Sequence, residues 1–122
     1  LLEFSKESVD ALKSVLDKYN GKIIVSSSWK EYKSVEFIKE NYFMDYDLDK
    51  YIIGKTPDIS SIDRSEEIVK DMNNRNLNLK DILILDDIEL EGDLVKRHIQ
   101  TNLYEGLTKY HLSLINVLLE RR

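Results

Sequence analysis

The chain has 122 residues, with 18 basic and 23 acidic side chains, a formal net charge of −5 and no cysteine. Leu, Ile, Val and Phe account for 40 residues. That share is well above the roughly 20% of disordered chains, so we expect one globular domain covering residues 1–122. The acidic balance argues against a general coat for nucleic acid, and no apolar run approaches the ~18 residues of a membrane span. With no secretory leader and no cysteine, the sequence predicts a cytoplasmic protein.

Helices and short apolar strands alternate along the chain. Some segments repeat apolar residues at helical spacing, and others are continuous apolar runs rich in β-branched residues, typical of buried strands. In chain order we expect a helix at 4–21, a strand at 22–26, a helix at 29–42, an irregular stretch at 43–50, a strand at 51–53, a helix from Asp63 to Asn73, a strand at 82–85, a short helix at 88–97, a weak strand at 98–101 and a helix from Thr108 onward. This order predicts an α/β fold, a three-layer Rossmann-like parallel sheet with helices on both faces.

The two most apolar strands should lie at the centre of that sheet. Strands of a parallel sheet are covered on both faces, so their side chains are shielded from water whichever way they point. We therefore expect near-complete burial of six strand residues, namely Ile23, Ile24, Val25, Ile82, Ile84 and Leu85.

Polar side chains follow three of the predicted strands. Ser26 and Ser27 follow the first strand, Lys55 follows the second, and Asp86 with Asp87 follows the third. In open α/β sheets, ligands bind beyond the carboxyl ends of the strands. We therefore expect hydroxyls, a lysine and a carboxylate pair to meet at one rim of the sheet.

This set of side chains suits a phosphate and a metal ion. The repulsion between Asp86 and Asp87 would be relieved by a hard cation such as Mg²⁺, which prefers oxygen ligands. Hydroxyls and backbone N–H groups at a helix start suit a phosphate. Arg64, at the start of the third helix, could face the same rim.

Each of these residues also has a purely structural interpretation. The acidic pair could be turn residues, the serines an ordinary N-cap, and Lys55 a solvated lysine. Arg64 could pair with Glu67, which lies three residues along the same helix. His98 is better explained as a half-buried sheet residue than as a metal ligand.

Five segments, taken in order, resemble one known superfamily. They are Ile-Ile-Val-Ser-Ser-Ser-Trp-Lys at 23–30, Ile-Gly-Lys-Thr-Pro at 53–57, Arg-Ser-Glu-Glu-Ile at 64–68, Ile-Leu-Ile-Leu-Asp-Asp at 82–87 and Gly-Leu-Thr at 106–108. This order resembles the haloacid dehalogenase (HAD) superfamily. More narrowly, it resembles the small HAD-like domains of RNA-repair ("Swiss Army Knife") proteins, over nearly the whole chain.

The resemblance implies a Mg²⁺-dependent phosphohydrolase acting on a phosphomonoester, with a nucleotide or a nucleic-acid end as the candidate substrate. Four loops would surround the phosphate. By position, Ser27, with Ser26 as the alternative, would hydrogen-bond the phosphoryl oxygens. Arg64, with Lys55 as the weaker candidate, would neutralise the phosphoryl charge. Asp86 and Asp87 would hold Mg²⁺.

The sequence departs from the family pattern at the first loop. That loop carries an Asp-x-Asp after a hydrophobic strand, and residues 1–4 do not supply it. The missing strand would lie between the strands at 22–26 and 82–85. Upstream residues could supply it, the two strands could close up, or another segment could fill the slot. Because the chain begins with Leu1, we expect the first, with the aspartyl-phosphate forming on an Asp upstream and the 122-residue chain inactive alone.

Two other functions compete with the phosphohydrolase. A non-catalytic HAD-like module would keep the fold and bind a partner or a phosphate without turnover. A receiver-type phosphoacceptor also gathers acidic residues, a hydroxyl and a lysine around Mg²⁺. Its acidic pair follows the first strand, whereas the pair here comes late, so this third function fits least well.

Overall fold

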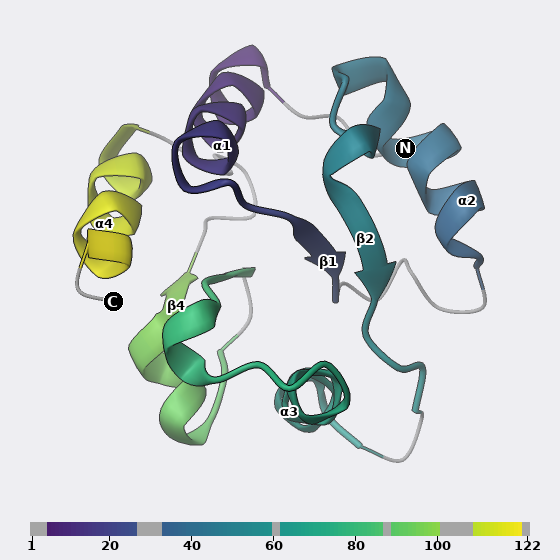
Figure 1. The fold of residues 1–122 in the computed structure, drawn as a ribbon, viewed down its shortest axis with the longest axis vertical. Coiled ribbons are helices and arrows are strands. Elements are labelled where there is room, and N and C mark those ends of the chain that lie inside the picture. Colours follow the sequence, from purple (N-terminus) through teal and green to yellow (C-terminus); the bar gives the residue numbers. More distant parts are fainter. Residues whose placement is uncertain (1–4, 27–32, 60–61, 87–88, 101–108, 121–122) are drawn as a thin grey trace.

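The computed structural model describes residues 5–26, 33–59, 62–86, 89–100 and 109–120. Four α-helices and four short strands follow one another through these residues, with a 3₁₀ helix in place of an α-helix between the third and fourth strands (Figure 1). They are α1 (Lys6–Tyr19), β1 (Ile23–Val25), α2 (Val35–Ile38), β2 (Ile52–Lys55), α3 (Arg64–Asn74), β3 (Ile84–Asp86), β4 (His98–Gln100) and α4 (Lys109–Glu120). The alternation and the order of the predicted elements are therefore confirmed.

Several bounds differ from the prediction. In the described part of the helix expected at 29–42, only Val35–Ile38 is α-helical. It continues directly into a wider π-helical turn, Lys39–Phe43. The stretch expected to be irregular contains two 3₁₀ turns, Met44–Tyr46 and Asp49–Tyr51. The short helix expected before β4 is a 3₁₀ helix, Gly92–Arg97.

The strands pair in parallel, but in two groups. β1 pairs with β2, and β3 pairs with β4, so the described residues form two separate two-stranded parallel sheets. Each described strand is therefore bonded to one neighbour, and β1 and β3 have not closed up against each other. The α/β class is confirmed, and the single three-layer sheet stays a prediction.

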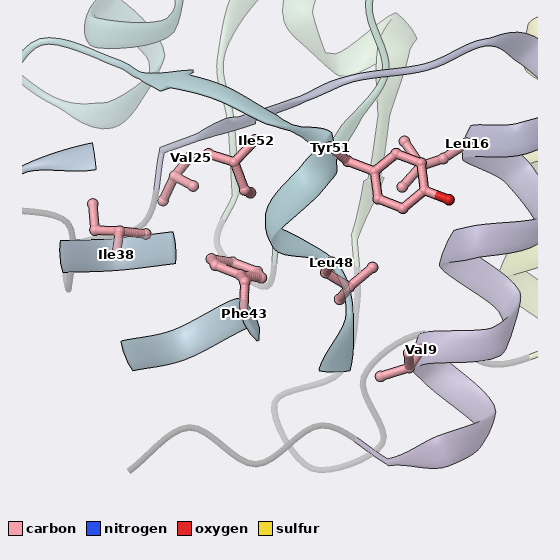
Figure 2. Packing of buried hydrophobic residues seen from close by; sticks show 8 residues of the cluster. All are labelled: Val9, Leu16, Val25, Ile38, Phe43, Leu48, Tyr51 and Ile52. Atoms are coloured by element: carbon pink, nitrogen blue, oxygen red, sulfur yellow. The ribbon is translucent and has the colours of Figure 1, made fainter. Parts of the chain in front are cut away.

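Helix α1 connects the two sheets. Its N-cap is Ser5, whose Oγ accepts a hydrogen bond from Ser8 N at 3.1 Å, and it ends at Asn20 in the left-handed conformation. One side of α1 packs in a cluster with β1, β2 and the segment before β2. The buried members of that cluster are Val9, Leu16, Val25, Ile38, Phe43, Leu48, Tyr51 and Ile52 (Figure 2). A second cluster joins α1 to β4 and α4 through Ala11, Val15, Ile99 and Ile115.

Helix α3 covers the other face of the β3–β4 sheet. Successive side chains of a strand point to opposite faces. Leu83 and Leu85 pack against the cluster of α1 and α4, whereas Ile84 packs against Ile68 of α3. Helices therefore lie on both faces of this sheet. Ile84 and Asp86, on either side of Leu85 in the strand, are on the face toward α3.

Burial of the strands is less complete than expected. Val25 and Ile84 are buried, as predicted. Ile23, Ile24, Ile82 and Leu85 are only partly buried, so the prediction was wrong for these four. For Ile23, Ile24 and Leu85 the physical reason lies in the pairing, because a two-stranded sheet leaves one edge of every strand without a covering neighbour. Ile82 precedes β3 and follows the 3₁₀ turn Leu79–Asp81, so it is not part of a sheet.

A buried arginine ties the end of α4 to β3. Arg97 is buried, and its guanidinium donates three hydrogen bonds to backbone carbonyls. Nε donates to Ile82 O at 2.8 Å, Nη1 to Leu118 O at 3.1 Å and Nη2 to Lys80 O at 3.5 Å. The C-terminal helix is thus fixed to the segment that leads into β3.

No helix of the described residues is long and apolar enough to cross a bilayer.

Candidate functional site

Among the predicted site residues that the structure describes, Arg64 and Asp86 are in direct contact. Arg64 is the first residue of α3, and Asp86 is the last residue of β3, 22 positions later. Arg64 Nη1 lies 2.9 Å from both Oδ1 and Oδ2 of Asp86. The rim that the sequence predicted therefore brings the arginine and the first member of the acidic pair into direct contact.

Local folding rules explain why these two side chains meet. Asp63 caps α3 by accepting a hydrogen bond from Glu66 N at 2.9 Å, which places Arg64 at the first helical position. Ile84 packs against α3, and Asp86, two residues later, shares its face of the strand. The end of the strand and the start of the helix thus present their side chains to each other.

The contact is largely shielded from water. The Asp86 side chain is 6% exposed and the Arg64 side chain is 17% exposed. A buried carboxylate is costly unless it is paired and hydrogen-bonded, and the guanidinium meets both needs. Asp86 is therefore a carboxylate that already holds a cation against both of its oxygens.

The backbone of Asp86 has its own partner on the neighbouring strand. His98 lies opposite Ile84 in the β3–β4 register, and its Nε2 lies 3.0 Å from Asp86 O. A carbonyl oxygen only accepts, so Nε2 carries the proton in this contact. The half-buried sheet position predicted for His98 is confirmed. Its contact with Asp86 was not foreseen, because it depends on strand register.

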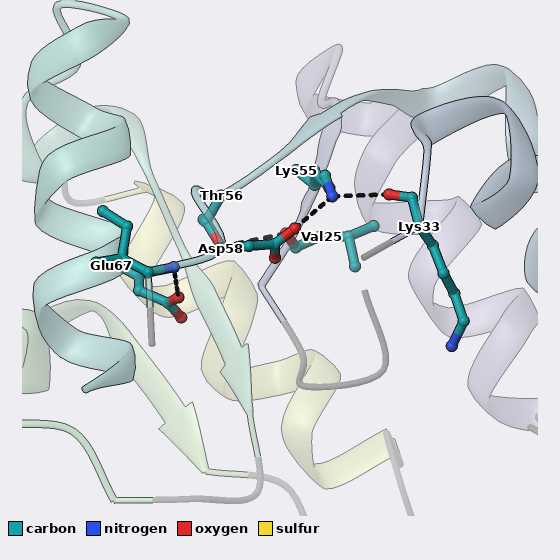
Figure 3. Close-up of polar contacts among 7 residues, drawn as sticks. Val25, Lys33, Lys55, Thr56, Asp58 and Glu67 are labelled. Carbon is teal, nitrogen blue, oxygen red and sulfur yellow. Dashed lines mark hydrogen bonds and ion pairs between the residues drawn. The ribbon is translucent and has the colours of Figure 1, made fainter. Parts of the chain in front are cut away.

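Lys55 lies in a different set of contacts (Figure 3). Its Nζ lies 2.6 Å from Asp58 Oδ2 and donates to Lys33 O at 2.7 Å. The ammonium therefore closes the turn after β2 and ties it to the segment before α2. The interpretation of Lys55 as a solvated lysine is not supported, and the structure places Arg64, rather than Lys55, on Asp86.

The neighbouring residues of this turn are fixed by buried polar groups. Thr56 N donates to Val25 O at 2.9 Å, which extends the pairing of β1 and β2 by one residue. Glu67 is buried, and its Oε2 accepts from Ile59 N at 3.1 Å (Figure 3). Glu67 thus anchors the turn, and the structure favours the rim interpretation of Arg64 over a local pair with Glu67.

The remaining predicted residues are described only in part. Ser26 follows β1 directly and is partly buried. Ser27 and Asp87 lie outside the described residues. In the part of the chain that the structure describes, no group of three or more His, Asp or Glu side chains is arranged to hold a metal ion. Asp86 therefore contributes one carboxylate, and the metal site of the full acidic pair stays a prediction.

Comparison with known proteins assigns the chain to a family. The structure defines an α/β domain in which an arginine and a carboxylate meet at the end of a parallel strand. The family model for the HAD domain in Swiss Army Knife RNA repair proteins matches residues 1–112. The chain belongs to that family, as its sequence motifs predicted. Comparisons with curated proteins and with solved structures found no match.

Proposed function

We propose that this domain is a Mg²⁺-dependent phosphohydrolase of the HAD type that acts on a phosphomonoester. The observation that carries the proposal is the contact of Arg64 with Asp86 at the end of β3. It puts a fixed positive charge and a buried carboxylate side by side, and phosphoryl transfer depends mainly on positioning and charge stabilisation. The family match supports the HAD assignment.

Arg64 would bind the phosphoryl oxygens. It lies at the N-terminus of the 11-residue helix α3, where the helix dipole is positive. A cation at this end does not stabilise the helix, but it adds to the attraction for an anion. Ser27, or its neighbour Ser26, would donate a hydrogen bond to the same oxygens. Lys55 is the weaker candidate for the charge role, because its ammonium contacts Asp58 and Lys33 O at the turn after β2 rather than Asp86.

Asp86 fits a divalent cation. Its carboxylate supplies the oxygen ligands that Mg²⁺ prefers, and it is buried and already turned toward a positive charge. Asp86 would hold the ion, with Asp87 as the second ligand that the sequence provides. When bound, Mg²⁺ would neutralise charge on the phosphoryl group.

The nucleophile would come from outside residues 1–122. The proposal requires an Asp-x-Asp at the end of a strand upstream of Leu1. A strand between β1 and β3 would pair with both, and in the described residues each of these strands is bonded to one neighbour. In the reaction, the bond from phosphorus to the leaving alcohol breaks and a bond to the aspartate oxygen forms. The second Asp gives its proton to the leaving oxygen, which departs as the alcohol. Water then attacks the phosphorus of the aspartyl-phosphate and loses a proton to the second Asp, which releases phosphate and restores the first Asp.

The substrate class follows from the family and the charge. The family description names RNA repair, which favours a phosphorylated nucleotide or a nucleic-acid end as the substrate. The net charge of −5 disfavours extended contact with a nucleic-acid backbone. We therefore propose recognition of one terminal phosphate in a local site.

The test is turnover by the natural full-length protein. With Mg²⁺, it should hydrolyse p-nitrophenyl phosphate and an end-phosphorylated oligonucleotide, and Asp86→Asn should remove nearly all of this activity. Asp71→Asn is the matched control. Asp71 is also a buried aspartate that forms an ion pair with an arginine, Arg75, but it lies within α3. The chain of residues 1–122 should be inactive. Turnover by that chain, or by full-length Asp86→Asn, would contradict the proposal.

One observation favours a second candidate, a non-catalytic module. The charge of Asp86 is balanced by Arg64 without any metal ion. Such a site could bind a phosphate or a partner without catalysing its turnover. Full-length protein that binds an end-phosphorylated oligonucleotide, with no turnover at any Mg²⁺ concentration, would favour this candidate over the enzyme.

A further inference from the structure

The Arg64 guanidinium occupies the position at which a cation would bind Asp86. Nη1 is equidistant from the two carboxylate oxygens, at 2.9 Å from each, so both oxygens that could bind a cation already face a positive charge. The Asp86 side chain is only 6% exposed, so little of the carboxylate remains open to solvent. An incoming ion therefore meets a carboxylate that is already neutralised.

We infer that Arg64 and a divalent cation compete for Asp86, so that the metal ion and a phosphate group assist each other's binding. This inference rests on the proposed function, because it takes Asp86 as a metal ligand and Arg64 as a phosphate ligand. Mg²⁺ at Asp86 would leave Arg64 without its carboxylate and repel it, since both are positive. The released guanidinium would then be available to phosphoryl oxygens.

The reverse order gives the same coupling. A phosphate group that draws Arg64 away from Asp86 leaves a buried carboxylate without its counter-charge, which is unfavourable until a cation arrives. Coupling between two ligands is reciprocal, so each must raise the other's affinity by the same factor. Without a substrate, the site stays closed by its own arginine and holds Mg²⁺ weakly.

Helix α3 offers an internal comparison. Arg75 Nε lies 2.9 Å from Asp71 Oδ2, so the same two residue types form a pair of the same length at the other end of the helix. This second pair lies within one helix and closes no predicted ligand site. Its arginine can therefore be changed as a matched control.

The experiment measures the Mg²⁺ affinity of the full-length natural protein by calorimetry, with Mg²⁺ alone and no phosphate. Removing the competing charge in Arg64→Gln should tighten Mg²⁺ binding by about tenfold, within the ~5–150-fold range of typical couplings. Arg75→Gln should bind as the wild type does. Arg64→Lys, which keeps a charge but loses the planar fork, should give an intermediate affinity and serves if Arg64→Gln does not fold.

Inorganic phosphate provides the second arm of the experiment. Saturating phosphate should tighten Mg²⁺ binding in the wild type more than in Arg64→Gln. Equal Mg²⁺ affinity of wild type and Arg64→Gln would overturn the inference and leave the proposed metal site standing. No Mg²⁺ binding by any variant would overturn both the inference and the proposed function.

Discussion

Two arginine–aspartate pairs lie on helix α3, and they differ in what they connect. Arg64 pairs with Asp86, and Arg75 pairs with Asp71, each with a closest distance of 2.9 Å. Both carboxylates are buried. The first pair joins the start of a helix to the end of a strand 22 residues away, whereas the second lies within a single turn of the helix. Pairs with the same closest distance therefore connect different parts of the chain.

Helix electrostatics explain one pair and not the other. Arg75 follows the last residue of α3, where a positive charge stabilises the helix dipole. Arg64 lies at the opposite end, where a positive charge opposes it. Residues that break a local rule are expected at functional sites. The comparison teaches that helix electrostatics account for the position of Arg75, whereas the position of Arg64 is accounted for by its contact with the end of β3.

The largest expected loss of stability concerns Ile84. Its packing against α3 fixes which face of β3 Asp86 shares with it, and so supports the contact with Arg64. Truncating a buried Ile to Ala costs about 2–5 kcal/mol. Ile84→Ala should lower the free energy of unfolding by this amount in chemical denaturation, and Ile53→Ala is the control, since Ile53 is 52% exposed. A loss below ~1 kcal/mol for Ile84→Ala would contradict its core position.

The next effect separates the two carboxylates. Asp86→Asn removes the charge that holds a poorly exposed guanidinium, and hydrogen bonds to charged groups are worth about 1.5–3 kcal/mol. Asp71→Asn should cost less than ~1 kcal/mol, because Arg75 is 30% exposed and can turn to water. Both losses are measured by urea denaturation without Mg²⁺. Equal losses would remove the distinction between the pairs.

Double-mutant cycles measure the same distinction directly. The coupling between positions 75 and 71 should stay below ~1 kcal/mol, because Arg75 is 30% exposed and can turn to water. The coupling between positions 64 and 86 should exceed ~1 kcal/mol, because the contact is drier and uses both oxygens. Raising the salt concentration should weaken the first coupling more than the second. The reverse ranking would break the comparison.

The smallest effect concerns Gly54 of β2. A Cβ at this position would collide with Nη2 of Arg75, which lies over the strand. Gly54→Ala should therefore push the guanidinium aside at a cost below ~1 kcal/mol, since the end of a long side chain moves easily. In an Arg75→Ala background the cost of Gly54→Ala should fall. An unchanged cost would show that Arg75 does not determine the need for glycine.

The sequence predicted what depends on local pattern. The Asp63 cap placed Arg64 at the start of α3, and the apolar run before Asp86 placed it at a strand end, so their meeting followed from the topology. The contacts of Lys55 and His98 were not predicted. They depend on the path of a turn and on strand register, which adjoining residues do not determine. The gap between the two sheets lies between β1 and β3, which is where the sequence placed the strand that residues 1–122 do not supply.

The three carbonyl oxygens around Arg97 have a consequence for the last described helix in concentrated salt. Dissolved ions screen the attraction between exposed charged side chains, whereas buried contacts are screened much less. Arg97 is buried, and its partners are neutral backbone oxygens rather than a carboxylate. The tether from Arg97 to Leu118 O should therefore persist at salt concentrations that weaken the exposed ion pairs, such as Lys6 with Asp10. Helix α4 would then stay docked under conditions in which surface charges no longer hold their partners.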